Sequence, residues 1–279
     1  SLAIVMSYKS DEGIKIQKKT ILLKEIEKED SLNKIPIIAF IGAGNHASRT
    51  LIPAFKKTDG ILHTLYSSGG VSGVHHGLKS GFQYTSTDID EIWTSEEINT
   101  IVIATRHDNH AELVSKALDS GKNVFVEKPL ALSLKQLDKI NSSLQNSKNP
   151  PLLMVGFNRR FAPHIIKMHS LLELIKEPKS IIMTINAGSL PQDHWLNNPE
   201  VGGGRIIGEG CHFIDLMMYL TGHSIVSHQS LAIGSSSSIE TQNDKVSINL
   251  SFEDGSMGTI HYLSNGGSSF PKERIEVFC

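Results

Sequence analysis

The segment FIGAGNHASRTLIPAF, residues 40–55, decides the fold. It starts at the end of an apolar run, IPIIAFI (35–41), and continues into a helix-like stretch. Gly42 permits a tight turn between the two, and Gly44 lets a dinucleotide pyrophosphate approach the backbone at the helix N-terminus. Ala47 stands where the third glycine of this fingerprint usually lies, and alanine is a tolerated variant there. The segment therefore predicts a dinucleotide-binding turn.

Apolar runs and helix-like segments alternate along the first half of the chain. The runs lie at 35–41, 61–66, 101–105, 124–127 and 152–157, and their near-continuous hydrophobicity is typical of strands covered on both faces. Helix-like segments follow the first, third and fourth runs, at 45–57, 108–123 and 133–147. This alternation predicts the α/β class, with a Rossmann-type doubly wound parallel sheet over residues 35–157. Asn109 and Glu112 have capping-box spacing, and Gly121 follows the last turn of that helix.

The pattern changes after residue 157. We expect helices at 162–175 and 209–220, a Pro- and Gly-rich loop at 188–204, and strands at 180–187, 245–252 and 257–263. Strands and helices no longer alternate regularly in this part. The sequence therefore predicts a separate α+β domain over residues 158–279.

The composition excludes several classes of protein. Of the 279 residues, 39% are hydrophobic and 20% are charged, and the formal net charge is -2. Lysine and arginine are spread along the chain, so no nucleic-acid partner is expected. No apolar run approaches the roughly 18 residues that span a bilayer, so no membrane association is expected. Cys211 and Cys279 are too few for a disulfide framework, which favours a cytoplasmic location.

The turn after the second apolar run bears on the choice of cofactor. An acidic residue usually binds the adenosine ribose of NAD at this place, but the chain has YSSGG at 66–70. Without a carboxylate the 2′-phosphate of NADP is not repelled, and without an arginine it is not attracted, so NAD and NADP both stay open. The residues expected to contact the dinucleotide at the two turns are Gly42, Gly44, Asn45, His46, Ser67 and Ser68.

Five further segments resemble the Gfo/Idh/MocA family of oxidoreductases: IVIATRHDNHAE (101–112), VFVEKPLALS (124–133), MVGFNRRFAPH (154–164), NAGSLPQDHW (186–195) and GGGRIIGEGCHFIDL (202–216). The resemblance covers residues 35–279 and is to the variant that forms the C-terminal half of fused two-part oxidoreductases, behind a zinc-type dehydrogenase portion. It implies a substrate domain with an open, largely antiparallel sheet, through which homo-oligomers are expected to form. It also implies that residues 1–34 are a junction with a preceding domain and that the chain is truncated at its C-terminus.

Lys128 is the first catalytic candidate. It follows the strand at 124–127, and open α/β sheets bind ligands at the carboxyl ends of their strands. A lysine there can hydrogen-bond a substrate hydroxyl and help to remove its proton as the hydride leaves. The family's Glu-Lys-Pro motif implies a fixed turn, and X-Pro bonds are readily cis, so we expect a cis peptide at Lys128–Pro129. Glu127 and Lys128 are also expected to contact the cofactor.

His212 is the second catalytic candidate, because the resemblance places a proton-transferring histidine here. The family's usual aspartate, four residues earlier, is replaced by Gly208. Glu209 lies three residues before His212, and such positions share a helix face. We therefore expect Glu209 to supply the missing carboxylate in the cleft and to raise the pKa of His212. Asp215, three residues after His212, is expected to orient the imidazole ring.

The remaining candidates follow other strand ends and the Pro- and Gly-rich loop. The resemblance implies that Thr105, Arg106, His107 and His110 line the cofactor. Substrate contacts are expected from Asn158, Arg159, Arg160, Trp195, Arg205 and Asp215, although one of the first two arginines can instead form an ion pair that packs the domains. His75 and His76 do not face each other on a helix and have no Cys or acid at ligand spacing, so no metal site is expected.

The resemblance and these residues together imply an NAD(P)-dependent oxidoreductase. Its expected substrate is a secondary alcohol or ketone of a sugar, a nucleotide sugar or a cyclitol. Two alternatives stay open. One is a redox-silent dinucleotide-binding sensor, which the missing aspartate at Gly208 favours. The other is NAD-dependent glycoside cleavage, which begins with the same hydride step.

Overall fold

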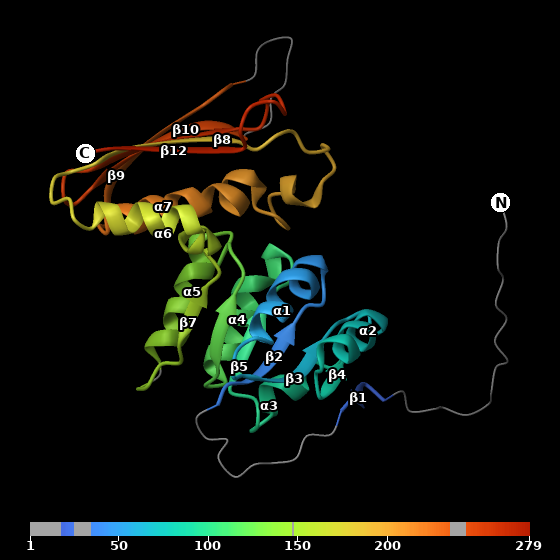
Figure 1. Ribbon diagram of the computed structural model, residues 1–279. Helices are drawn as coiled ribbons and strands as arrows, with labels where there is room; N and C mark the ends of the chain where they lie inside the picture. Colours follow the sequence, from blue (N-terminus) through green and yellow to red (C-terminus); the bar gives the residue numbers. More distant parts are fainter. Residues whose placement is uncertain (1–17, 25–34, 147, 235–243) are drawn as a thin grey trace, which may run out of the picture.

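The structure, a computed structural model, describes residues 18–24, 35–146, 148–234 and 244–279. Its elements form two sheets with their helices, one from each half of the chain (Figure 1). The strand order is β1-β4-β3-β2-β5-β6-β7 in the first sheet and β12-β8-β11-β10-β9 in the second. The predicted combination of a doubly wound α/β sheet and a largely antiparallel second sheet is confirmed.

The first sheet contains the five expected strands and two short ones. The parallel strands are β2 (Ile37–Ile41), β3 (Ile61–Tyr66), β4 (Tyr84–Ser86), β5 (Thr100–Ile103), β6 (Asn123–Val126) and β7 (Leu153–Val155). Strand β1 (Thr20–Leu22) pairs antiparallel with β4. It lies inside segment 1–34, so part of this expected junction extends the sheet, while residues 1–17 and 25–34 lie outside the described residues.

Helices cover both faces of this sheet. Successive side chains of a strand point to opposite faces, and since these strands are mostly apolar, both faces carry apolar side chains that must be covered. On one face, Phe40 packs with Ile52 in the run formed by the π-helix η2 (Ala47–Leu51) and α1 (Ile52–Phe55). On the other, Ile41 packs with Val114 and Ile140. The helices of that face are α3 (Asp90–Thr94), α4 (His110–Asp119) and α5 (Leu134–Gln145), and α2 (Val71–Ser80) packs on β3 and β4.

The predicted capping box of α4 is wrong. Asn109 belongs to a preceding 3-10 turn, η3 (His107–Asn109), and its own backbone is helical, so its side chain makes no capping hydrogen bond. Glu112 instead forms an ion pair with Lys116, one turn further along the helix. The predicted end of the helix is confirmed, because Gly121 has a φ of 71°.

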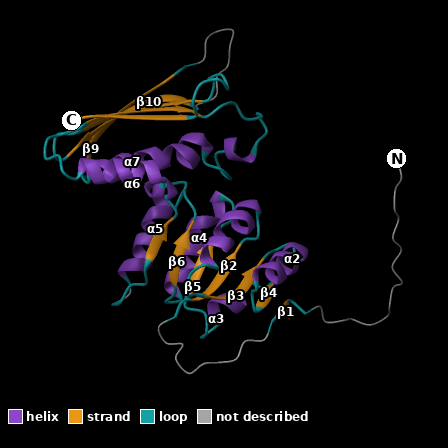
Figure 2. Cartoon of the chain, in the orientation of Figure 1, coloured by secondary structure: helices purple, strands orange, loops and turns teal. Residues whose placement is uncertain are grey.

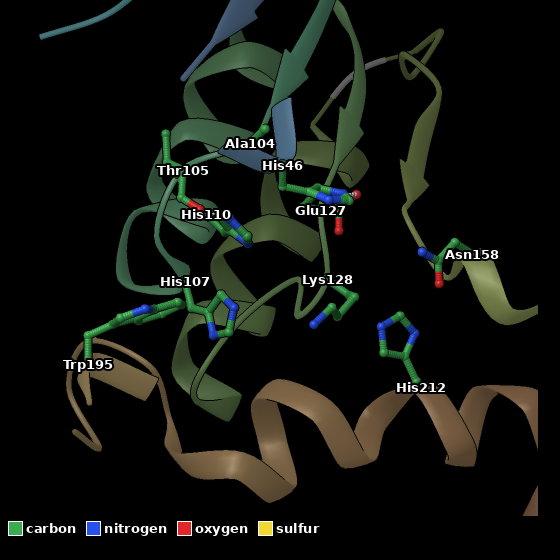
Figure 3. Close-up of a pocket in the computed structure, with 10 residues that line it drawn as sticks. All are labelled: His46, Ala104, Thr105, His107, His110, Glu127, Lys128, Asn158, Trp195 and His212. Carbon is green, nitrogen blue, oxygen red and sulfur yellow. Dashed lines mark hydrogen bonds and ion pairs between the residues drawn. The ribbon is translucent and has the colours of Figure 1, made fainter. Parts of the chain in front are cut away.

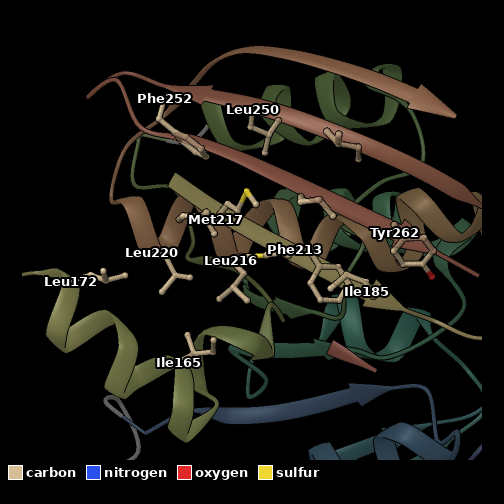
Figure 4. Close-up of a cluster of buried hydrophobic side chains, with 14 residues drawn as sticks. Ile165, Leu172, Ile185, Phe213, Leu216, Met217, Leu220, Leu250, Phe252 and Tyr262 are labelled. Carbon is tan, nitrogen blue, oxygen red and sulfur yellow. The ribbon is translucent and has the colours of Figure 1, made fainter. Parts of the chain in front are cut away.

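The second sheet carries its helices on one face. Its strands are β8 (Ser180–Asn186), β9 (Ile225–Ala232), β10 (Lys245–Phe252), β11 (Met257–Leu263) and β12 (Glu273–Phe278), and only β8 and β11 pair in parallel. Leu216 and Met217 of α7 (Cys211–Thr221) pack against the sheet, as does Ile165 of α6 (Pro163–Leu172) (Figure 4).

Helices α6 and α7 lie between the second sheet and the first unit (Figures 1 and 2). The start of α7 is thereby brought to the carboxyl edge of the first sheet. Three short helical segments complete this region: η4 (Asn158–Phe161), η5 (Trp195–Asn197) and the π-helix η6 (Ile206–Gly210). Among the described residues, no helix combines the length and the apolar character that crossing a membrane requires.

Candidate active site

A cavity of about 330 Å³ lies between the two units (Figure 3). Its lining from the first unit follows the carboxyl ends of β2, β5 and β6, which are neighbours in the sheet. The start of α7 and the segments η4 and η5 supply the rest. The lining residues are His46, Ala104, Thr105, His107, His110, Glu127, Lys128, Asn158, Trp195 and His212. Open α/β sheets bind ligands at this edge, so the cavity is the candidate active site.

The Gly-x-Gly turn has the shape that a dinucleotide needs. Gly42 has a φ of 109°, and a Cβ there would lie 2.4 Å from the carbonyl oxygen of Ala104, so only glycine fits. At Gly44, by contrast, no neighbouring atom lies within 4 Å of the place of a Cβ. The backbone at the start of η2 therefore borders open space, and a helix N-terminus in this setting suits a pyrophosphate. The turn fits an NAD-type cofactor.

The other residues predicted at the two turns lie around this space. His46 lines the cavity, with its Nε2 3.1 Å from Oε1 of Glu127. Asn45 is exposed beside it. Ser67 and Ser68 follow β3 at the same edge but do not line the cavity; the Ser67 hydroxyl lies 2.7 Å from that of Ser72, while Ser68 is exposed.

Lys128 lies in the cavity, on the predicted cis bond to Pro129. Its Nζ donates a hydrogen bond of 2.8 Å to the carbonyl oxygen of Gly208, which belongs to the opposite wall. Beneath this turn, the fully buried His110 has Nδ1 2.8 Å from the Pro129 oxygen and Nε2 3.3 Å from the Thr105 oxygen. Burial lowers the pKa of His110. The contact with the Pro129 oxygen ties His110 to the turn that carries Lys128.

His107 connects the two units. Its Nδ1 lies 2.9 Å from the carbonyl oxygen of Gly202, and its ring packs edge-on against Trp195 with 4.9 Å between centroids. Burial lowers the pKa of His107 to about 4; the hydrogen bond to Gly202 opposes this shift, and the neighbouring His110 and Lys128 contribute to it. Thr105 lines the cavity beside it. Arg106 does not line the cavity; its Cζ lies over the Trp195 ring, 5.9 Å from the ring centroid.

His212 also lines the cavity, from the first turn of α7. Only 6% of its surface is exposed, and its buried Nδ1 has no hydrogen-bond partner among the described residues. Burial lowers its pKa to about 3, helped by the positive charges of Lys128 and Arg159. The predicted rise in the pKa of His212 is therefore wrong, because no carboxylate contacts its ring.

The two acids expected beside His212 have other partners. The Glu209 carboxylate bonds to Arg205, at 3.0 Å, and to the hydroxyl of Tyr262 on β11. It does not line the cavity, because residues 206–210 form a π-helix whose wider turn does not keep the i,i+3 spacing of an α-helix. Asp215 likewise pairs with Arg160 instead of His212. The predictions that Glu209 replaces the missing aspartate and that Asp215 orients the ring are wrong.

Most of the predicted substrate residues are structural. Arg160 is held by Asp215, and Arg159 forms an ion pair of 2.6 Å with Glu273. Arg205 is 3% exposed and donates to the backbone oxygens of residues 187 and 188, so it braces the second sheet and is not a pocket wall. Only Asn158 and Trp195 of this set line the cavity.

The sequence did not predict the residues that bind the side chains of Arg159 and Glu209. Glu273 and Tyr262 lie on strands far along the chain, and nothing in their local pattern indicates contacts with Arg159 and Glu209. It also missed Ala104, whose backbone meets Gly42. His75 and His76 lie on α2, with 5.0 Å between ring centroids. In the part of the chain that the structure describes, no three His, Cys, Asp or Glu side chains gather as metal ligands would.

Comparison with known families agrees with this geometry. The family described as "Oxidoreductase family, NAD-binding Rossmann fold" matches residues 37–157, and the Gfo/Idh/MocA C-terminal domain matches residues 175–279. The chain belongs to the Gfo/Idh/MocA oxidoreductase family. Gly208 stands where the resemblance implies an aspartate, and among the described residues no carboxylate contacts the His212 ring in its place.

Its relatives in the Gfo/Idh/MocA family are distant. The protein named "Uncharacterized oxidoreductase YrbE" of Bacillus subtilis is 26% identical over 199 residues, which cover 70% of this chain and 57% of that protein. The myo-inositol 2-dehydrogenase of Thermotoga maritima is 25% identical over 205 residues, covering 72% and 60%. The chain thus spans about six-tenths of the length of these relatives. A levoglucosan dehydrogenase solved with NADH shares the fold, with a TM-score of 0.74 at 18% identity over 88% of this chain and 71% of that chain.

Proposed function

We propose that the protein is an NAD(P)-dependent oxidoreductase that transfers a hydride between the nicotinamide and a secondary alcohol or ketone of a sugar, nucleotide sugar or cyclitol. The observation that carries the proposal is the position of Lys128. It brings an ammonium group into a cavity bordered by the Gly-x-Gly turn on one side and by His212 on the other. A bound nicotinamide dinucleotide supplies the hydride acceptor or donor.

The residues of the first unit have the chemistry to hold that cofactor. The backbone after Gly42 and Gly44, with Asn45 and His46, would bind the pyrophosphate side. Ser67 and Ser68 would meet the adenosine ribose. Thr105, His110 and Glu127 border the part of the cavity nearest Lys128 and would contact the nicotinamide half.

Two residues would act on the substrate. Lys128 donates hydrogen bonds and carries a positive charge, so it would stabilise the negative charge that develops on a carbonyl oxygen as the hydride arrives and give that oxygen its proton; in the reverse direction the amine takes the proton back. His212 is neutral in its buried setting, and a neutral ring can accept a hydrogen bond from a second hydroxyl. Such a pair suits a polyol better than an apolar alcohol. The names of the inositol and levoglucosan dehydrogenases among the similar proteins support the same substrate class.

The test is a turnover assay with the purified protein. NAD⁺ or NADP⁺ is offered with a panel of cyclitols, hexoses, anhydrosugars and nucleotide sugars, and the absorbance of the reduced cofactor is followed. We expect reduction with at least one polyol. Cofactor binding without turnover of any compound, in either direction, would favour a redox-silent sensor, and release of the leaving group from a glycoside would indicate glycoside cleavage.

We further propose that the protein forms a homo-oligomer through the second sheet. Helices α6 and α7 cover one face of this sheet, while the other carries outward side chains such as Ile182 and Thr259. Light scattering of the protein in solution should give a multiple of the chain mass of 30.6 kDa. A single-chain mass at micromolar concentration would contradict the proposal.

A further inference from the structure

A side chain on residue 208 would fit only if its neighbours shifted. A Cβ on Gly208 would lie 2.7 Å from Cδ1 of Leu196, 3.0 Å from Cε1 of His107 and 3.3 Å from the Gly202 oxygen. These contacts are shorter than carbon atoms in proteins normally make. The imidazole of His107 therefore occupies the space into which a side chain at 208 would project, although it comes from the other unit.

The hydrogen bond to Gly202 fixes the tautomer of His107. A carbonyl oxygen only accepts hydrogen bonds, so Nδ1, 2.9 Å away, must carry the hydrogen. In the neutral ring Nε2 is then a bare acceptor. Nε2 has no hydrogen-bond partner among the described residues. The atom is not fully buried, and since His107 lines the cavity we take its open side to face the cavity. Burial keeps the ring neutral, with a pKa of about 4.

The other rings of the cavity are arranged differently. Both nitrogens of His110 face backbone oxygens, and Nε2 of His46 faces Glu127. His212 makes no hydrogen bond that would fix its tautomer. His107 thus presents a free acceptor, and both the Gly202 bond and the edge-on contact with Trp195 fix its orientation. Nδ1 of His46 is also left as an acceptor, but that side chain is half exposed.

Lys128 and His107 meet at the same residue. Nζ of Lys128 lies 2.8 Å from the Gly208 oxygen, and Cε1 of His107 faces the Gly208 Cα. Figure 3 shows Lys128 between His107 and His212. An ammonium group can only donate, whereas a hydroxyl needs an acceptor for its own hydrogen as well. A substrate hydroxyl bound to Lys128 therefore needs an acceptor, and His107 lines the same cavity as Lys128.

We propose that His107, through Nε2, accepts a hydrogen bond from the substrate hydroxyl bound to Lys128 and so takes the place of the carboxylate that Gly208 lacks. His107 is then a substrate-contacting residue on the dinucleotide-binding unit, and it selects a hydroxyl at the reacting carbon. The proposal rests on the proposed function, because it needs a polyol in this cavity.

Two substitutions of His107 distinguish the role of Nδ1 from that of Nε2. In His107→Asn the amide reaches about as far as Nδ1 and keeps the Gly202 bond, but nothing stands at Nε2. In His107→Gln the amide oxygen reaches about as far as Nε2. We expect His107→Gln to keep most of the turnover and His107→Asn to lose about tenfold, the effect of one hydrogen bond, at unchanged NADH affinity. Equal or higher turnover of His107→Asn would overturn the proposal and leave His107 a tether between the units.

A second measurement does not depend on turnover. The ¹⁵N spectrum of histidine-labelled protein at neutral pH, assigned with His107→Asn, should show His107 neutral and protonated on Nδ1. Protonation on Nε2, or a charged ring, would overturn the proposal even in an active protein. Inactive wild-type protein across the whole polyol panel would instead contradict the proposed function, while the spectrum would still show whether the acceptor exists.

Discussion

At the scale of single residues, Gly208 and His107 form a steric pair. The imidazole lies where a side chain on 208 would project, and Leu196 closes the same space from η5. A carboxylate at position 208 would therefore require His107 and Leu196 to shift. The consequence for the site is that His107 and His212 line the cavity beside Lys128, and its carboxylate, Glu127, lies at His46.

Gly208→Asp should destabilise the protein. Its Cβ would lie 2.7 Å from Leu196 and 3.0 Å from His107, and overpacking of this kind costs about 1–3 kcal/mol in the free energy of unfolding. Urea unfolding measures that change. Gly234→Asp is the matched control, because apart from its chain neighbours no atom of the described residues lies within 4 Å of the place of its Cβ. Equal stability of the two variants would contradict the packing described here.

The neutral histidines should also make stability depend on pH. Burial lowers the pKa of His107 to about 4 and that of His212 to about 3, from 6.5. Below about pH 6.5 the unfolded chain takes up protons on these rings and the folded protein does not, so the free energy of unfolding falls as the pH is lowered towards 4. The slope is at most about 1.4 kcal/mol per pH unit and ring. Urea unfolding at pH 7 and pH 5 should show a smaller loss for His212→Asn than for wild-type protein, and equal losses would contradict the assignment.

At the scale of elements, the prediction from sequence succeeded for strands with a clear apolar run and missed strands, such as β4 and β9, that have none. Strands β2, β3 and β5 lie inside the sheet, so their residues are mostly apolar, although β3 also contains the buried His63 and Thr64. Strand β9 was missed because it is exposed along most of its length and has no apolar face. Helix α2 was missed because its buried residues are Gly73 and Gly77, which give no apolar period.

In the candidate site, too, some residues could be predicted from local sequence and others could not. Lys128 and the Gly-x-Gly turn follow from strand ends, and a strand end fixes where its next residues lie. The direction of the Glu209 side chain depends on the π-helix at 206–210 and on Tyr262 of a distant strand. Neither can be predicted from the spacing of residues around Glu209. The ion pairs of Arg159 and Arg160 depend on tertiary packing in the same way.

Gly44→Val tests the element that binds the cofactor. No atom lies within 4 Å of the place of a Cβ on Gly44, so the variant should fold as the wild type does. The new side chain would fill the space at the start of η2, and we expect NADH affinity to fall by at least about tenfold, as the loss of one good contact does. Calorimetry measures that affinity. Unchanged binding would show that the dinucleotide does not use this turn.

At the scale of the whole molecule, the site exists only where the two units meet. Three hydrogen bonds join them at the cavity: Lys128 to the Gly208 oxygen, His107 to the Gly202 oxygen and the Asp108 amide to the Val201 oxygen. The first unit supplies the dinucleotide turn and the lysine, and the second supplies His212 and Trp195. Hydride transfer by this protein would therefore require both units in the arrangement of Figure 1.

Lys128→Met tests the central claim most directly, because methionine keeps an unbranched apolar side chain and removes the ammonium. The measurement is the rate of cofactor reduction with the polyol that the wild-type protein turns over, with NADH affinity determined on the same sample. Lys135→Met is the control, since Lys135 is exposed on α5. The account predicts a loss of at least about 100-fold in the rate, the usual effect of removing an acid–base group, at unchanged NADH affinity and with the control fully active. A Lys128→Met rate equal to that of the control would contradict it.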